Sequence, residues 1–289
     1  MSIAATLRPS DALRRRVEHI LIQVGVWSFV VVLAFPIVWM VITAIKQDAD
    51  LYTEDAIPLW FKHSPTLANF DVLFNHTEFV VWVINTVEVS VLVVLITLVV
   101  AVPAGYSLAR LQFPGSTTLS ILIFLTYLVP SSLLFIPLSQ VVVQLGLQDS
   151  RWSLVVVYPT FTIPFCVWLM SGFFKTVPRE IEEAARTDGC SRLGAAVRVV
   201  LPVSTPGILS LIIFAFTLSM QEFIYVLTFV SSSAEKTVTL GVTTDLVRGD
   251  VYYWGSLMAG ALLVGIPVAI VYNFFLDHFV AGLTGGAVK

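Results

Sequence analysis

Residues 182–207 read EEAARTDGCSRLGAAVRVVLPVSTPG, a charged stretch that interrupts an otherwise strongly apolar chain. Long segments with almost no charge flank it at 153–174 and 203–230. Of the 289 residues, 57% are hydrophobic and 12% are charged, and the mean hydropathy is +0.90. Soluble domains carry roughly 25% charged residues, so this composition is typical of a membrane protein. The charged stretch therefore lies between two candidate membrane spans.

Six segments are apolar enough to cross a membrane, which takes about 20 residues in a helix. We predict membrane helices over residues 20–45, 84–108, 118–145, 153–174, 203–230 and 254–276. The first follows three arginines, as a signal peptide would, but its apolar run is too long for a signal core and no small-residue cleavage site follows it. We expect kinks at the prolines within these spans, which are Pro36, Pro103, Pro130, Pro137 and Pro164. The prediction is a single all-α, polytopic membrane domain over residues 1–289.

Lysine and arginine are unevenly distributed between the connecting segments. The N-terminal segment and residues 175–202 carry most of them. The positive-inside rule therefore predicts that both termini and the 175–202 loop are cytoplasmic. Residues 46–83, 146–152 and 231–253 are then the external loops.

The charged stretch itself predicts two short helices joined by a tight turn. Pro178 can occupy the first position of a helix, where its missing N–H is not needed. Glu182 and Glu183 lie near this start, where their charge suits the helix dipole, and Glu182 can pair with Arg186 four residues on. Gly189 suits the left-handed conformation that ends a helix.

The faces of these two helices indicate a docking element. Ser191 can cap the second helix, and an apolar stripe is expected on it at Leu193, Val197, Val200 and Leu201, up to Pro202. On the first helix, small or short side chains are expected to share one shallow face: Ile181, Ala184, Ala185 and Asp188. A solvated loop is the ordinary explanation of a charged stretch. The alanine pair and the fixed turn favour contact with another protein instead.

The motifs in this region resemble those of a known family. Glu183-Ala184-Ala185, Asp188-Gly189, Leu201-Pro202 and Pro206 are similar to the cytoplasmic EAA motif of ABC importer permeases. The match is with the maltose-type carbohydrate permeases, in their second, shorter subunit. Further matching motifs follow in order along nearly the whole chain: Asn69-Phe70, Asn85-Thr86, ARLQFPG at 109–115, Val129-Pro130, IPL at 136–138 and VAGLTGGAVK at the end.

The resemblance implies a type I ABC importer permease fold and an ATP-driven mechanism. It implies a second, different permease, two copies of an ABC ATPase and an extracytoplasmic sugar-binding protein as partners, with ATP and Mg²⁺ used by the ATPase and no cofactor bound by this chain. Residues 178–188 correspond to the coupling helix, and Glu183 is expected to pair with a basic ATPase residue. The residues implied in docking are Glu182, Glu183, Ala184, Ala185, Asp188, Gly189, Leu201 and Pro202.

Polar side chains within the spans are candidates for the solute pathway. Gln221, Glu222 and Tyr225 lie together in the fifth span. Carboxylates within a membrane are costly and commonly functional, and polar groups beside an aromatic ring suit a sugar. The alternative is that Glu222 reaches water or an interfacial partner. That explanation is favoured for Glu88, near the outer end of the second span.

The external segments leave two alternatives open. Residues 231–250 are either a simple connector or, as the resemblance suggests, a loop that enters the binding protein. Residues 46–82 are expected to form a small external cap. His63 and His76 within it are interpreted as surface residues, because no metal-ligand pattern surrounds them.

Other classes of protein fit the sequence less well. An ion-coupled secondary transporter usually shows internal repeats and charges at the membrane midplane. An intramembrane enzyme would need a GxSG-like serine with an in-membrane histidine, an aspartate pair or an HExxH run, and none occurs; there is also no GxxxxGK[ST] phosphate loop. A purely structural membrane protein would leave residues 178–202 unexplained. We therefore predict a non-catalytic transport subunit with no metal site and no nucleic-acid partner.

Overall fold

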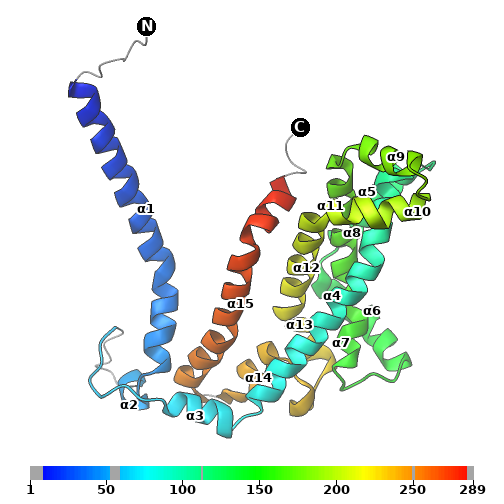
Figure 1. Cartoon of the computed structure of the whole chain (residues 1–289). Coiled ribbons are helices and arrows are strands. Elements are labelled where there is room, and N and C mark those ends of the chain that lie inside the picture. Colours follow the sequence, from blue (N-terminus) through cyan, green and yellow to red (C-terminus); the bar gives the residue numbers. More distant parts are fainter. Residues whose placement is uncertain (1–8, 53–58, 112, 249–250, 285–289) are drawn as a thin grey trace. The chain divides into compact units, whose positions relative to one another are not determined.

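The computed structural model describes residues 9–52, 59–111, 113–248 and 251–284, and most of them are helical (Figure 1). Four long helical segments are apolar enough to span a membrane. They are α1 (Pro9–Ala44), α4 (Phe79–Arg110), the consecutive pair α7 (Trp152–Val157) and α8 (Pro159–Thr176), and α15 (Trp254–Thr284).

The third and fifth predicted spans are broken. α5 (Ser116–Tyr127) and α6 (Ser131–Gln144) meet at 92°, and the helical segment Arg192–Val203 meets α12 (Thr205–Met220) at 74°. The first bend lies at Pro130, where a kink was predicted, and six spans result if each bent pair counts as one. The second bend lies at the start of the span predicted over 203–230, which is a single helix only as far as Met220. At the first break, Pro130 precedes α6 with extended backbone, because proline offers no N–H and restrains the residue before it. At residues 221–223 the fifth segment breaks again, before α13 (Ile224–Phe229).

The chain divides into two compact units. The first contains the chain up to Phe70 and residues Trp254–Leu262. Here the side-chain amide of Asn69, at the start of α3 (Ala68–Asn75), donates to the carbonyls of Ala44 and Lys46, at 3.0 and 2.8 Å. Asp50, in α2 (Asp48–Leu51), accepts from the ring of His63 at 2.6 Å. This contact and the neighbouring N–H groups lower the pKa of Asp50.

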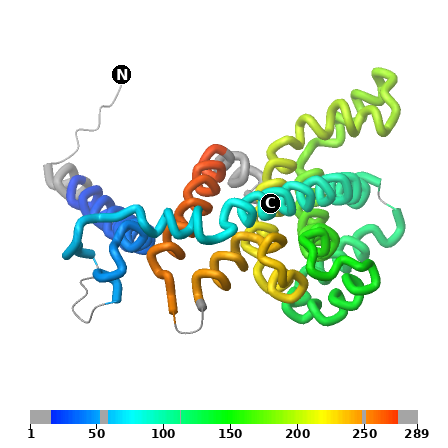
Figure 2. The backbone as a smooth tube through the Cα atoms, turned by 90° about the horizontal axis from the view of Figure 1, so that it is seen from below, coloured from blue at the N-terminus to red at the C-terminus, as the bar shows by residue number. Residues whose placement is uncertain are grey.

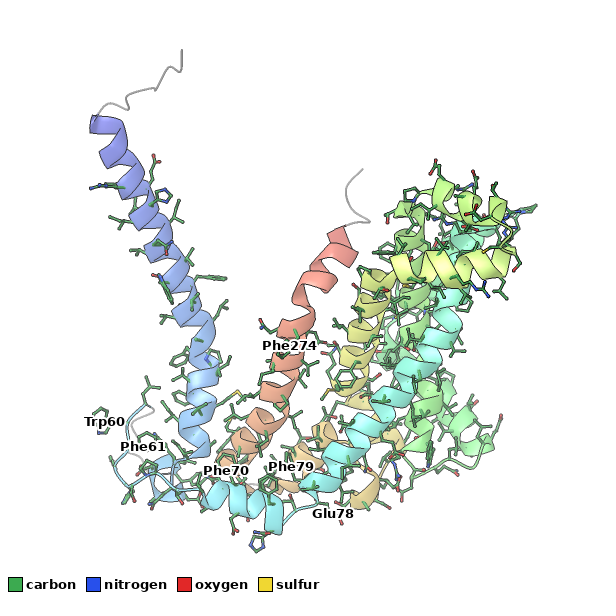
Figure 3. All side chains as sticks on the ribbon, in the orientation of Figure 1. Trp60, Phe61, Phe70, Glu78, Phe79 and Phe274 are labelled. Atoms are coloured by element: carbon green, nitrogen blue, oxygen red, sulfur yellow. The ribbon has the colours of Figure 1, made fainter. Side chains whose placement is uncertain are left out.

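Large side chains of the segment 46–82, predicted to be an external cap, are partly exposed. Trp60 is 69% exposed (Figure 3), as expected for an aromatic residue at a membrane interface. The ring of His63 is also half-exposed, although its contact with Asp50 makes it more than a simple surface residue. No group of three metal ligands occurs among the residues that the structure describes.

The second unit is built around α4. α8 and α12 pack along it, and their buried side chains form one apolar core, which includes Val94, Ala101, Met170 and Leu211. Gly105 allows α4 and α8 to approach closely: a Cβ there would lie 2.7 Å from the Cβ of Met170. A second core joins α4, α7 and α13 through Val93, Leu154, Tyr158, Tyr225 and Phe229.

The segment after α13, which the sequence predicts to be external, is attached to this unit by several hydrogen bonds and ion pairs. It contains a 3-10 turn (Ser233–Glu235), α14 (Val238–Asp245) and the antiparallel strands β1 (Val247–Arg248) and β2 (Val251–Tyr252), the orange pair in Figure 2. This hairpin is the one small departure from an all-helical fold among the described residues. Asn85 on α4 donates to the carbonyls of Ala234 and Lys236, at 2.8 and 2.9 Å. Arg151 bridges Glu88 and Glu235, at 2.9 and 2.8 Å, so Glu88 has the interfacial partner that its position predicted.

Candidate functional site: a charged elbow and a cavity at two helix breaks

Residues 178–203 form a helical elbow at one end of the second unit, which we call the elbow (Figures 1 and 2). α9 (Arg179–Thr187) is its first arm. Pro178 lies just before this helix with ψ 137° and is not its first residue, a small correction to the prediction. Gly189 has φ +94°, so the predicted left-handed turn is confirmed. The Ser191 hydroxyl then accepts the Gly194 N–H at 3.0 Å, which confirms the predicted cap.

The two faces of α9 have different roles. Glu183, Ala184, Asp188 and Gly189 are exposed, whereas Glu182 and Ala185 are buried against the unit. Ile181, Ala184, Ala185 and Asp188 lie along one side of α9, as their i, i+3, i+4 and i+7 spacing predicts. The boundary of the buried face, however, runs between Ala184 and Ala185, so this side is not a single exposed docking face. Of the predicted docking set, the exposed residues are available to a partner. Ala185 instead lets the helix lie close to its own unit.

Glu182 fixes α9 to the end of α4. Its carboxylate accepts from the Tyr106 hydroxyl at 2.6 Å and lies 3.6 Å from Nε of Arg110. Arg110 also donates to the carbonyl of Val177 at 2.7 Å, just before α9. The predicted ion pair of Glu182 with Arg186 is not formed between these described residues. Glu182 faces the protein, and a buried carboxylate requires a partner there.

Arg110 and Tyr106 belong to this site through their contacts with Glu182, and they were not predicted from the sequence. A signal was present: they are four residues apart at the end of a span and so share one helix face. A lone arginine closing an apolar helix also needs a buried partner or water. What could not be read from the sequence was that Glu182, far along the chain, supplies that partner.

The second arm of the elbow contains a π-helical turn. It consists of α10 (Arg192–Ala195), the π turn Ala196–Val200 and α11 (Leu201–Val203). The helix runs through Pro202, where the prediction ended it, because the wider π turn lets the Leu201 N–H bond the Ala196 carbonyl before the proline. Val200 is fully buried, while Leu193 is 75% and Val197 is 52% exposed. The predicted apolar stripe is thus divided between the core and the surface.

The exposed side of the elbow carries both signs of charge. A hollow of about 70 Å³ is lined by Arg110, Arg179, Glu182, Glu183, Arg186 and Arg192. Arg110 and Glu182 form its buried floor and pair with each other. Arg179, Glu183, Arg186 and Arg192 are exposed and can form charge-assisted hydrogen bonds with a partner of matching pattern. Leu201 is half-buried and Pro202 is exposed beside this region.

A larger cavity, of about 610 Å³, lies where the two broken spans meet. Its lining comes from both breaks: Tyr127, Leu128, Val129, Pro130 and Ser131 on one side, and Leu218, Gln221, Glu222, Phe223 and Ile224 on the other, with Phe161. Of the predicted pathway residues, Gln221 and Glu222 line it. Tyr225 is buried beneath and donates its hydroxyl to the Ser131 carbonyl at 2.7 Å.

The carboxylate of Glu222 caps α13. It accepts the backbone N–H groups of Ile224 and Tyr225 at 2.9 and 3.0 Å, and the Tyr158 hydroxyl at 3.2 Å. This cap satisfies the helix end that the break exposes within the span. Gln221 is exposed. Of the two polar residues that line the cavity, Gln221 therefore has the exposed side chain. The carboxylate of Glu222 is mainly used to cap α13.

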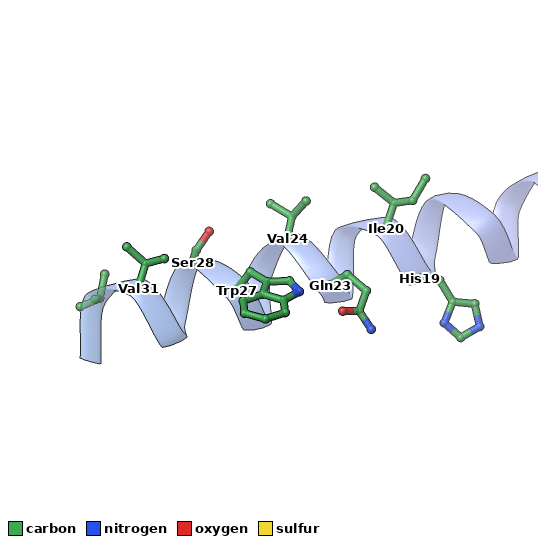
Figure 4. Close-up of a pocket in the computed structure, with 8 residues that line it drawn as sticks. His19, Ile20, Gln23, Val24, Trp27, Ser28 and Val31 are labelled. Atoms are coloured by element: carbon green, nitrogen blue, oxygen red, sulfur yellow. The ribbon is translucent and has the colours of Figure 1, made fainter. Parts of the chain in front are cut away.

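A further hollow, of about 720 Å³, is a surface groove. Its lining residues, including His19, Gln23 and Trp27, all belong to α1 (Figure 4). A site formed by one face of a single helix encloses nothing, and solute sites are concave. The exposed apolar side chains of α1 are those expected of a helix surrounded by lipid or by another subunit.

Comparison with known proteins identifies the family. Residues 101–285, more than half of the chain, match the family described as binding-protein-dependent transport system inner membrane component. The chain is 34% identical over 256 residues to the sulfoquinovosyl glycerol transport system permease protein SmoH of Agrobacterium fabrum, covering 88% of each. It is 33% identical over 258 residues to the diacetylchitobiose uptake system permease protein DasC of Streptomyces coelicolor, covering 89% of this chain and 92% of the relative.

Further similarities extend over the whole length. The trehalose/maltose transport system permease protein MalG of Thermococcus litoralis is 28% identical over 94% of this chain and 97% of its own. A bacterial ABC transporter chain involved in alginate import has the same fold, with a TM-score of 0.76 at 19% identity over 96% of this chain and 100% of that one. The fold is thus that of type I ABC importer permeases. This chain belongs to the family of inner-membrane components of binding-protein-dependent transport systems.

Proposed function

We propose that this chain is one permease subunit of an ATP-driven ABC importer for a sugar, oligosaccharide or related polyol. Relatives with a named solute support this class, since they are permeases for sulfoquinovosyl glycerol, diacetylchitobiose and trehalose or maltose. The partners are a second, different permease, two copies of an ABC ATPase and an extracytoplasmic sugar-binding protein. Both termini and the elbow are cytoplasmic. The chain is not an enzyme and binds no cofactor; the ATPases bind ATP and Mg²⁺.

The observation that carries this proposal is the construction of the elbow. α9 presents Glu183, Ala184 and Asp188 outward, while Glu182 attaches its inner face to Arg110 and Tyr106 of α4. A force applied to the outer face therefore reaches α4 through a short, buried contact. The second arm leads directly into α12. A flexible loop would absorb such a movement, and this capped pair of helices transmits it.

The cavity at the two breaks provides part of the path for the sugar. Its volume of about 610 Å³ falls within the range of small-molecule sites. Tyr127, Phe161 and Phe223 provide aromatic surface for the carbon face of a sugar ring, and the Gln221 amide can bind its hydroxyls. Because both breaks line this cavity, a movement of the elbow and α12 alters its walls.

Cysteine labelling tests which face of the elbow meets the ATPase. In a background with Cys190→Ala, we expect an impermeant maleimide to label Ala184→Cys in inverted vesicles and not in right-side-out vesicles. Coexpressed ATPase should protect it. Ala185→Cys is the matched control, because Ala185 is only 9% exposed and should label weakly throughout. Labelling of Ala184→Cys from the external side, or no protection at any stage of ATP turnover, would refute the proposed docking.

Energisation distinguishes ABC import from ion-coupled transport. We expect uptake in proteoliposomes that contain all subunits to require enclosed ATP and to persist with a protonophore. Uptake by this chain that collapses with the ion gradient and needs no ATPase would establish the secondary transporter instead.

A further inference from the structure

A second polar cavity, of about 440 Å³, lies between the ends of α4 and α8 and the start of α5. Two cations line it, Lys175 from the last turn of α8 and Arg179 from the first turn of α9. Three hydroxyl groups face them from the first turns of α5: Ser116, Thr117 and Ser120. The described lining residues include no carboxylate. This combination of cations and hydroxyl donors suits a phosphate group.

The same cavity continues into apolar surface. Phe124 and Trp168 line its other part, and their rings lie 4.9 Å apart. Phe124 is two turns beyond Ser116 along α5, and Trp168 is two turns before Lys175 along α8, so on both helices the polar groups lie at the same end. Trp168 remains 44% exposed. The lining therefore changes from cationic to aromatic along the two helices.

We propose that this cavity binds the phosphate headgroup of an anionic phospholipid, with an acyl chain along Phe124 and Trp168. Lipid recognition by basic pockets between membrane helices follows this pattern, and the aromatic floor has no role for a soluble phosphate. Two cations also favour a lipid with net negative charge over a zwitterionic one. The bound lipid joins the start of α5 to the end of α8, directly before the elbow.

A lipid can bind in this cavity whenever α5 and α8 lie in a membrane, whichever solute the transporter carries. The test uses the complete purified transporter in detergent, studied by native mass spectrometry with added phosphatidylglycerol or phosphatidylcholine. We expect retention of phosphatidylglycerol in preference to phosphatidylcholine. Lys175→Gln should weaken the binding of phosphatidylglycerol about fivefold, which is the contribution of one lysine near an anionic lipid surface. Trp168→Ala should also weaken it.

Arg198→Gln is the matched control, because Arg198 is an exposed cation of the elbow that does not line the cavity. Lipid retention should be unchanged by it. Equal retention of the two lipids, or an equal loss with Arg198→Gln, would overturn the proposal. Displacement of the lipid by inorganic phosphate at the same concentration would also overturn it, since the site would then recognise phosphate alone.

Discussion

Glu182 and Glu183 are adjacent residues with opposite environments. The side chain of Glu182 is 9% exposed and faces Arg110, whose side chain is 4% exposed. Glu183 points outward on the same helix. One carboxylate therefore holds the elbow together, and the other is available to a partner.

Removing the Glu182 carboxylate should destabilise the elbow. Glu182→Ala leaves the Arg110 guanidinium buried without its counter-charge, a loss of about 3 kcal/mol for a pair of this kind. We expect a lower thermal unfolding temperature of the purified transporter, and ATP hydrolysis that no longer drives uptake. Glu180→Ala is the control, because Glu180 is exposed on the same helix. Equal effects of the two changes would show that the Arg110 contact is unimportant.

Reversing the charge of Glu183 should act on docking alone. Because this side chain is exposed, Glu183→Lys should leave the chain inserted at wild-type abundance while abolishing ATP-driven uptake and the copurification of ATPase. Immunoblotting of membranes and radiolabelled-solute uptake measure the two properties. Normal transport by this variant would count against the docking role of α9.

The turn at Gly189 sets the angle between α9 and α10, the two arms of the elbow. Its φ of +94° strains any β-branched residue, although a Cβ there would meet nothing within 4 Å. A larger side chain at position 189 would therefore not collide with its neighbours. It would be disfavoured by the backbone conformation, at a cost of about 1–3 kcal/mol.

Gly189→Val should therefore abolish uptake without preventing insertion. Gly189→Asn should retain much of the activity, because asparagine tolerates the left-handed conformation. Gly172→Ala is a control, since Gly172 lies within α8 without a positive φ and a Cβ there also meets nothing within 4 Å. If Val and Asn at position 189 transport equally well, the conformation of this turn is not required.

The segment after α13 contains a second element that can be tested. Asp149, at φ +53°, accepts the N–H groups of Ser231 and Ser232, both at 2.7 Å. The Ser232 hydroxyl and these N–H groups lower the pKa of Asp149 below 3.8. A lowered pKa means that this attachment is complete above pH 3.8 and is lost as the pH falls through the lower, folded value.

Asp149→Asn should loosen this attachment at neutral pH. Asparagine keeps the left-handed backbone and removes the charge, so we expect faster hydrogen exchange at Ser231 and Ser232. In the wild type, the backbone amides of Ser231 and Ser232 should stay protected from hydrogen exchange down to about pH 4, after correction for the intrinsic exchange rate. Unchanged exchange in the variant would show that the backbone of this segment is held by its other contacts, such as that with Asn85.

The cavity at the two helix breaks is proposed as part of the solute path. Gln221→Ala removes the exposed amide from its wall, and we expect a several-fold rise in the KM for uptake, from the loss of about one neutral hydrogen bond. ATPase coupling should persist, because the elbow is untouched. Gln144→Ala, at the exposed end of α6, is the control. A rise in KM with both variants would remove the cavity from the solute path.

The apolar spans, the turn at Gly189, the cap at Ser191 and the motif that indicates the family could all be predicted from the amino-acid sequence. Each of these depends on residues close together in the chain, where hydropathy and backbone preference act directly. The pairing of Glu182 with Arg110 instead of Arg186 could not be predicted and is seen only in the folded chain. The same is true of the cap that Glu222 makes on α13 and of the cavity that the two breaks share. These outcomes depend on contacts between distant segments, because a buried charge takes whichever partner the packing brings near it.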